Sequence, residues 1–291
     1  MDFCTTYAEV KRYHGTSFRD YLRNIALDTL SILMGDDAKN ALYAKPRVHF
    51  LYFHHIFEDE AEGFERFVAL LAEKHRFISH SEAVDKLVNG TVDQPYITWS
   101  SDDGFKNNLI AAEILNRYDA SCCFFVNPDT INLEDKEKIF QFCDTKLVMP
   151  PIEFMTWSDL EKLLYQGHEI GSHTMSHDNV SGMALSDFEE DLVMSKRILE
   201  QHCGPIRHFA YPYGRYDCFS KDAYDLVFKT GYDSCSTAVR GSHWANEEGI
   251  PKDKLFIRRD QIIAAWKLSH LQYFVANSVK NMSPEGNILP Y

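Results

Sequence analysis

Strand patterns and helix patterns alternate along most of the chain, and this alternation limits the possible folds more than any other feature. Near-continuous apolar runs at 47–56 and 121–126 are typical of strands buried on both faces. Helical periodicity at 62–75 and 107–118 separates the strands. Repeated strand–helix units predict a parallel sheet with helices outside it, and one α/β barrel is an ordinary solution for 291 residues. The same analysis predicts further helices at 81–89, 157–166, 186–203, 219–229 and 261–279, and further strands at 95–101, 168–172, 207–211, 232–236 and 254–259.

An amphipathic helix is expected at 16–34, before the first strand, with Gly35 as its end. This helix could cap one end of the barrel, contact a partner or lie on a membrane. Because it contains Asp20 and Asp28 and few basic residues, we favour a packing role. The expected organisation is an N-terminal helical extension (1–45), a barrel domain (46–280) and a C-terminal tail (281–291).

The composition narrows the class of protein. Apolar residues make up 45% of the chain, which is enough for a large core without disulfide bonds. The formal charge of −13 argues against nucleic acid, or an anionic membrane surface, as the main partner. Seven cysteines without a CxxC spacing, no signal-peptide pattern and no stretch long enough to cross a bilayer predict a cytoplasmic protein. The sequence indicates no oligomeric state.

Two polar clusters follow predicted strand ends. Asp102 and Asp103 come directly after the strand at 95–101, and the segment 167–177 carries His173 and His177. An Asp-Gly pair alone is usually a solvated turn. A carboxylate and two histidines from separate segments, however, make a metal-ligand set, and the carboxyl ends of barrel strands form one rim. The four-residue spacing places both imidazoles on one face if the segment forms a helical turn.

Such a set predicts hydrolytic chemistry. Three protein ligands leave positions open for water and substrate, which is the catalytic rather than the structural kind of zinc site. Only one of the two adjacent aspartates is needed as a ligand, so the other could hold and deprotonate a water, whose pKa the ion lowers to about 7.

Three ordered motifs resemble those of the polysaccharide deacetylases with a NodB homology domain, carbohydrate esterase family 4. They are Ser101-Asp-Asp-Gly104, Gly171-Ser-His-Thr-Met-Ser-His177 and Phe209-Ala-Tyr-Pro-Tyr-Gly214, the last a variant of the family's third motif. The resemblance covers residues from about 47 to 265. It implies a single distorted (β/α)7 barrel, here with an N-terminal helix added.

The resemblance also implies roles for individual residues. Asp102 would be the catalytic base, and Asp103, His173 and His177 would hold a divalent metal ion, most often zinc in this family. The backbone N–H of Tyr213 would stabilise an oxyanion, with Pro212 and Gly214 fixing the loop.

Departures from the family pattern leave other roles open. The arginine of the third motif is replaced by Ala210, so Arg259, or Arg258, is the candidate to orient Asp102, unless both are simply charges at the rim. For the proton donor, His270 matches a Leu-x-His motif but lies inside the last predicted helix.

Two further histidines and one tryptophan are candidates at the rim. His54 ends the first strand and is the favoured acid or pocket residue, with His55 less favoured; both could be structural. Trp244 is a candidate to stack on a sugar ring.

The resulting hypothesis is a metal-dependent hydrolase that removes N-acetyl groups from a saccharide, with an aspartate activating a water on the ion. A cytoplasmic location suggests an intermediate of glycan assembly, lipid- or nucleotide-linked, as substrate. The same site could act instead on an O-acetyl ester or a small cyclic amide or ureide. A carbohydrate-binding barrel without activity is a further alternative, although it would predict a broken ligand set.

Overall fold

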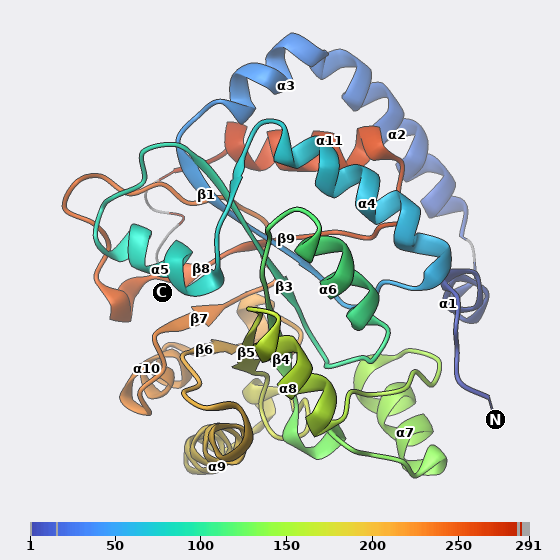
Figure 1. Cartoon of the computed structure of the whole chain (residues 1–291), viewed down its shortest axis with the longest axis vertical. Helices are drawn as coiled ribbons and strands as arrows, with labels where there is room; N and C mark the ends of the chain where they lie inside the picture. Colours follow the sequence, from blue (N-terminus) through green and yellow to red (C-terminus); the bar gives the residue numbers. More distant parts are fainter. Residues whose placement is uncertain (1, 16, 284–285, 287–291) are drawn as a thin grey trace.

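Parallel strands form one continuous sheet in the computed structural model, which describes residues 2–15, 17–283 and 286 (Figure 1). The strand segments of the described residues are β1 Arg47–Phe53, β2 Arg76–Phe77, β3 Pro95–Ser101, β4 Cys122–Val126, β5 Glu169–Ser172, β6 His208–Ala210, β7 Ser234–Ser236, β8 Phe256–Ile257 and β9 Arg259–Gln261. Their order in the sheet is β8-β7-β6-β5-β4-β3-β1-β9, and β2 pairs with β3.

The sheet closes through one bent strand. β8 pairs with β7 and β9 pairs with β1, and only Arg258 separates β8 from β9. The last strand, predicted as one piece at 254–259, is therefore two segments that join opposite edges of the sheet. Counting β8 and β9 as one strand, seven strands go round the barrel and β2 adds to β3, which confirms the predicted distorted (β/α)7 architecture.

Helices cover the outside of the barrel (Figure 1). Within the described residues they are α1 Tyr7–His14, α2 Phe18–Met34, α3 Asp36–Tyr43, α4 Glu58–Ala72, α5 His80–Val88, α6 Asn108–Asn116, α7 Lys136–Phe142, α8 Trp157–Tyr165, α9 Leu185–Cys203, α10 Lys221–Lys229 and α11 Leu268–Lys280. Among them, no helix combines the length and apolar character needed to cross a bilayer.

Several helix starts differ from the prediction, among them α4, which begins at Glu58 rather than 62. α9 begins at Leu185, one residue early, and the hydroxyl of Ser186 bonds to Asp187. α11 begins at Leu268 rather than 261, because the chain first continues alongside β1, where the Ile262 N–H donates to the Tyr52 carbonyl at 2.7 Å.

The N-terminal extension contains three helices where the sequence predicted one. α1 starts with a capping box between Thr6 and Glu9, and the N–H groups of Tyr7 and Ala8 donate to Asp59 at the start of α4. This pair of hydrogen bonds fixes α1 against the barrel. Thr16, the first residue of the predicted helix, and most of the predicted tail at 281–291 lie outside the described residues.

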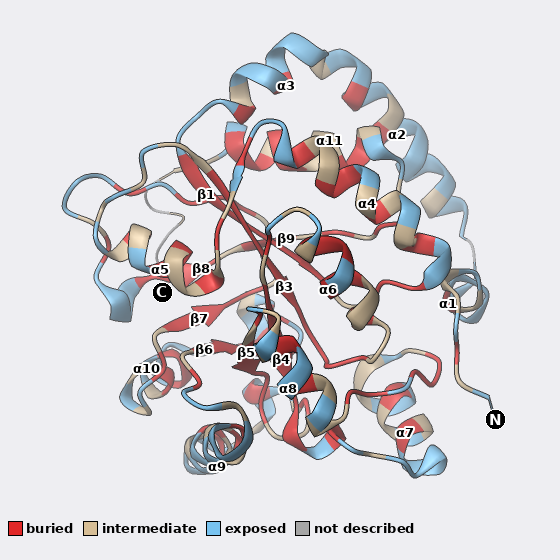
Figure 2. Cartoon of the chain, viewed as in Figure 1, coloured by how far each residue is buried: buried red, intermediate tan, exposed pale blue. Residues whose placement is uncertain are grey.

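α2 packs on the barrel through a narrow face. Leu27 and Ser31 are its only fully buried residues, and Figure 2 shows most of the helix exposed. The inner side of α2 packs as predicted, since Ser31 donates to the Ser269 carbonyl and Asp28 accepts from Lys267, but apolar side chains also point outward from its other side.

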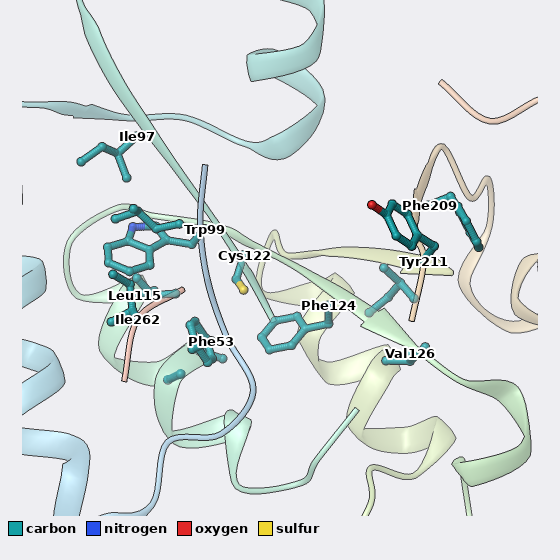
Figure 3. Packing of buried hydrophobic residues seen from close by; sticks show 14 of the residues in the cluster. Phe53, Ile97, Trp99, Leu115, Cys122, Phe124, Val126, Phe209, Tyr211 and Ile262 are labelled. Atoms are coloured by element: carbon teal, nitrogen blue, oxygen red, sulfur yellow. The ribbon is translucent and has the colours of Figure 1, made fainter. Parts of the chain in front are cut away.

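The main core lies between the sheet and the surrounding helices. Trp99 of β3 is fully buried there, and the rings of Phe64, Phe67 and Phe77 meet it edge-on at centroid distances of 5.4, 6.2 and 6.1 Å. Figure 3 shows Trp99 among Phe53, Leu115 and Ile262. This packing fixes β3, whose carboxyl end carries Asp102 and Asp103.

Replacing Trp99 by alanine should therefore destabilise the whole barrel. We expect Trp99→Ala to lower the free energy of unfolding by about 3–5 kcal/mol, because it leaves a large cavity in the core. Urea denaturation followed by circular dichroism measures this. Tyr165→Ala, at a side chain that is 94% exposed, is the control and should change stability by less than about 0.5 kcal/mol. Equal effects of the two variants would contradict this account of the core.

Candidate active site

The carboxyl ends of three strands, β3, β5 and β6, carry polar residues to one rim of the barrel. Asp102 and Asp103 follow β3, His173 follows β5, and Tyr213 follows β6. The backbone turns sharply after Asp102, with Asp103 at φ +72° and Gly104 at φ +72°. A Cβ on Gly104 would also lie 3.2 Å from Val126 of β4, so glycine permits both the turn and the close packing.

Asp103, His173 and His177 form a cluster that could hold a metal ion. Their ligand atoms all lie within 4.8 Å of one another. Asp103 Oδ1 is 3.5 Å from His173 Nε2 and 3.4 Å from His177 Nε2. At metal–ligand distances of about 2.0–2.1 Å, two ligands at a tetrahedral angle lie about 3.3 Å apart. The observed separations are therefore close to those of ligands around one zinc-sized ion.

Hydrogen bonding and electrostatics also suit a cation at this cluster. His173 Nδ1 donates to the Ala210 carbonyl at 2.7 Å, which leaves the lone pair of Nε2 directed at Asp103. Asp103 Oδ1 is buried and accepts no hydrogen bond from the described residues. Burial lowers the pKa of His177 to about 4, so its imidazole is neutral and able to donate a lone pair. Donor types, tautomer and an unpaired carboxylate oxygen all fit a divalent ion.

The loop that carries the two histidines is not the helical turn that their spacing suggested. Thr174 at φ +65° and His177 at φ +55° have left-handed backbone, and the loop bends so that both rings approach Asp103. Asn127 Nδ2 donates to the carbonyls of His173 and Thr174, and the Met175 N–H is 3.1 Å from both oxygens of Asp191. Asn127 and Asp191 are therefore positioning residues that the sequence motifs did not indicate.

Arg259 binds Asp102 through two parallel hydrogen bonds. Nη1 and Nη2 each donate to one carboxylate oxygen at 2.8 Å, while Nε donates to the Thr237 carbonyl at 2.9 Å. Burial alone would raise the pKa of Asp102, but the guanidinium beside it lowers that pKa below its usual value. Arg259, rather than Arg258, thus occupies the position beside Asp102. The Arg258 side chain instead donates to the Ser242 carbonyl.

His54 lines the cavity beside the two aspartates. Its Nδ1 is 3.2 Å from Nε2 of Gln261, a residue of β9 that the sequence analysis did not select. Because an amide N–H can only donate, Nδ1 is the acceptor and the ring proton resides on Nε2. The neighbouring His55 has another partner, Glu60 at 3.0 Å, which also caps the start of α4.

The loop after β6 presents Tyr213 to the cavity. Tyr213 has φ +63°, its ring meets the His177 ring at 5.0 Å, and its hydroxyl donates to the Lys146 carbonyl at 3.1 Å. Pro212, which precedes Tyr213 in this loop, is buried. A Cβ on Gly214 would lie 2.4 Å from the backbone nitrogen of Ala238, so only glycine allows this approach.

The cavity has a volume of about 570 Å³ and is walled by two segments from outside the strand ends. α1 contributes Tyr7, Val10 and His14, and the turn after α7 contributes the residues 146–149. Tyr13 Oη donates to Asp144 at 2.8 Å, which joins the two walls. The long segment 127–155, between β4 and α8, thus contributes one wall. The contribution of α1 was missed, although the pair Thr6 and Glu9 is a capping-box signature in the sequence.

Two of the residues selected from the sequence do not reach this cavity. His270 lies on α11, where its Nε2 bonds to Asp28 of α2 at 2.8 Å, so its suggested role as the proton donor has no support in the geometry. Trp244 lies beside His243, which bridges to Val48 at the start of β1. It is therefore at the amino end of the barrel, opposite to the cavity, because the segment after β7 runs back along the strands.

The fold and the site together define an α/β barrel with a carboxylate and two histidines at its carboxyl rim. Residues 89–234 match the family model described as polysaccharide deacetylase. The chain belongs to the polysaccharide deacetylase family.

Curated relatives match over a shorter region. A chitooligosaccharide deacetylase of Azorhizobium caulinodans is 34% identical over 80 residues, which are 27% of this chain and 37% of the relative. A second one, of Sinorhizobium fredii, is 32% identical over 88 residues, or 30% of this chain and 36% of the relative. The chain thus covers little more than a third of the length of these relatives.

Solved structures show the same fold at low sequence identity. IcaB from Ammonifex degensii superposes with a TM-score of 0.63 and 17% identity, covering 80% of this chain and 98% of that protein. The deacetylase PplD of Streptococcus pyogenes gives a TM-score of 0.62 with 16% identity, covering 80% of this chain and 98% of its own.

Removal of the Asp103 carboxylate should abolish metal binding while the barrel stays folded. We expect Asp103→Asn to lower the zinc content by at least about tenfold, because the cluster loses its one anionic ligand. Metal analysis after dialysis against zinc, with isothermal titration as a second measurement, tests this. Asp102→Asn is the matched control at the adjacent position and should keep the ion. Full zinc in Asp103→Asn would contradict the assignment of the ligands.

Proposed function

We propose that the protein is a metal-dependent hydrolase that removes N-acetyl groups from a saccharide. The observation that carries this proposal is the buried cluster of Asp103, His173 and His177 directly beside Asp102, which is itself held by Arg259. Family membership supports deacetylation, and the names of the two curated relatives support an N-acetylated sugar as the substrate.

Asp103, His173 and His177 would hold the metal ion, and zinc fits their donor set best. Two imidazole nitrogens and one carboxylate oxygen leave at least one position open, as in catalytic zinc sites. A zinc ion there supplies Lewis-acid chemistry, by polarising a carbonyl group and lowering the pKa of a water to about 7.

Asp102 is the proposed general base. It must be ionised to accept a proton, and the guanidinium of Arg259 keeps it so by lowering its pKa against the effect of burial. The two parallel hydrogen bonds also fix the plane of the carboxylate, which leaves its remaining lone pairs at constant positions next to the ligand cluster. Arg259 therefore acts as a positioning residue.

His54 is the proposed general acid. A neutral ring that lost its Nε2 proton would be left as an imidazolate, so the acid is the imidazolium form, in which His54 has taken up a second proton from solvent and Gln261 turns its amide oxygen to accept from Nδ1. Transfer of the Nε2 proton to the leaving amine then leaves a neutral imidazole. The backbone N–H of Tyr213, in its left-handed turn at the cavity edge, is the proposed donor to the oxyanion of the tetrahedral intermediate.

The walls of the cavity favour a short saccharide or the end of a longer one. α1 lies on one side and the residues 146–149 on the other, and Tyr13 and Tyr213 bond across to the second wall. An extended polymer needs a groove open at both ends, so we propose a glycan-assembly intermediate as the substrate. The proposed location remains the cytoplasm, in agreement with seven free cysteine thiols.

Asp102→Asn should lose turnover without losing the metal. We expect kcat to fall by at least about a hundredfold, because asparagine cannot accept the proton of the attacking water. The assay is acetate release from a panel of N-acetylated oligosaccharides, with O-acetylated sugars and cyclic ureides included to test the alternative substrates. Retained activity in Asp102→Asn would exclude this residue as the base. Turnover of only the esters or ureides would instead exclude N-deacetylation.

Substitution of His54 tests the proposed general acid independently of the proposed base, Asp102. His54→Ala should lower kcat on N-acetyl substrates by about a hundredfold or more, because an amine leaves only when protonated. Acetate esters of 4-nitrophenol need no such protonation, so their hydrolysis should fall far less. His55→Ala serves as the neighbouring control and should retain the activity on both substrates. Equal losses on amide and ester in His54→Ala would contradict a role as proton donor.

A further inference from the structure

α2 presents an apolar face to the outside of the molecule. Phe18, Tyr21, Leu22, Ile25, Ile32 and Leu33 are between 46% and 79% exposed. At about 100° per residue, these side chains fall within one third of the helix circumference, directly opposite Leu27 and Ser31, which pack on the barrel. We call these six side chains the outer face of α2. It contains no charged residue, and Phe18 and Tyr21 stack on each other at 6.4 Å.

The acidic groups of α1 and α2 are all bound within the protein. Asp20 accepts from Ser17 and pairs with Arg23, and Asp28 pairs with Lys267 and His270. Glu9 of α1 caps its own helix.

Three cations on the same two helices have no such partners. Lys11, Arg12 and Arg19 are exposed and form no hydrogen bond or ion pair with the part of the chain that the structure describes. By its helical position Arg19 flanks the outer face. Residues 1–45 hold six Lys and Arg and six Asp and Glu, so the whole net charge of −13 lies in the rest of the chain. The negative net charge of the whole chain therefore does not argue against contact between residues 1–45 and an anionic surface.

We propose that α2 binds the surface of an anionic lipid bilayer, with its outer face inserted between the headgroups and Arg19 at the phosphate level. Amphipathic helices of this kind insert apolar side chains to a depth of about 5–10 Å, and aromatic rings and long cations suit the interface. The length and polarity of α2 exclude a spanning orientation.

The charges beside the outer face favour a bilayer over a second copy of this chain as the occupant. A symmetric dimer would place the outer face of one copy against that of the other, and the acidic groups of α1 and α2 are already bound, so Arg19 would meet no free carboxylate of these two helices. Lipid phosphates supply such a partner, and the affinity for a bilayer grows with each apolar side chain that is buried.

Membrane binding would hold the cavity close to the lipid surface. α1, which lines the cavity with Tyr7, Val10 and His14, ends four residues before α2 begins. A saccharide attached to a lipid carrier would then reach the site without leaving the bilayer. The binding itself needs no substrate, so it can be tested whether or not the proposed function is correct.

Flotation of the full-length protein with lipid vesicles tests the proposal. The vesicles contain phosphatidylcholine with one quarter phosphatidylglycerol, or phosphatidylcholine alone. We expect the protein to float with the anionic vesicles, and at least about tenfold less with the neutral ones or at high salt. The triple variant Leu22→Ser, Ile25→Ser, Leu33→Ser should lose at least about tenfold in binding, and Arg19→Glu should lose binding to the anionic vesicles only.

The matched control replaces exposed apolar side chains elsewhere. Leu185→Ser, Val193→Ser, Met194→Ser changes three such residues of α9 and should leave flotation unchanged. Circular dichroism and thermal unfolding establish that both triple variants are folded. Absence of flotation in the wild type, equal flotation of the α2 variant, or a dimer in light scattering that the α2 variant abolishes would each overturn the proposal.

Discussion

The pair of Arg259 and Asp102 connects the closure of the barrel to the chemistry of its rim. Arg259 begins β9, the segment that pairs with β1 and completes the ring, and its guanidinium binds the carboxylate at the end of β3. A buried carboxylate is stable as an anion only when a cation and hydrogen bonds compensate for the lost water. The strand that closes the barrel therefore carries the positive charge that Asp102 requires.

The geometry of this pair explains why the partner is an arginine. Three donors of one planar group are used at once, Nη1 and Nη2 toward Asp102 and Nε toward the Thr237 carbonyl. A lysine ammonium carries its charge at one point and lacks this planar array of donors. It could not bind both Asp102 oxygens and the Thr237 carbonyl together. The ring of Tyr52 lies 4.4 Å from the guanidinium and adds a cation–π contact that fixes its plane. Each contact comes from a different strand, so the position of Asp102 depends on the whole barrel.

The local sequence was sufficient to predict the barrel and the segments that carry its ligands. Strand β3 was predicted at its observed bounds, because alternating apolar residues and the Asp-Asp-Gly break are local signals. The approach of Asp103 to His173 follows from the rule that parallel strands end at one rim. The detailed shape of the histidine loop does not follow from spacing, since it depends on Asn127 and Asp191, which lie elsewhere in the sequence.

The wrong predictions for His270 and Trp244 also arise because long-range contacts place these residues. His270 and Trp244 were selected by short motifs, but a motif does not specify on which end or face of the barrel it lies. His270 forms a hydrogen bond with Asp28, 242 positions away in the sequence, and the segment of Trp244 pairs with the start of β1 at the opposite end of the barrel. Gln261 was missed because no local sequence pattern marks it. Its role becomes visible only in the folded protein, where its side chain lies next to His54. Long-range contacts decide these positions, and one sequence does not contain them in readable form.

In the proposed membrane contact, the N-terminal extension would serve both binding and access to the cavity. One side of it is held to the rest of the chain: Asp59 binds the start of α1, and Ser31 of α2 and Tyr43 of α3 donate to carbonyls of α11. The opposite face of α2 exposes apolar side chains, and contiguous patches of this kind mark interaction surfaces. Because α1 also forms a wall of the cavity, a surface bound to α2 would lie close to the cavity. The proposed membrane contact and the proposed saccharide substrate are therefore compatible with each other, since a substrate held at the membrane surface would lie near the cavity.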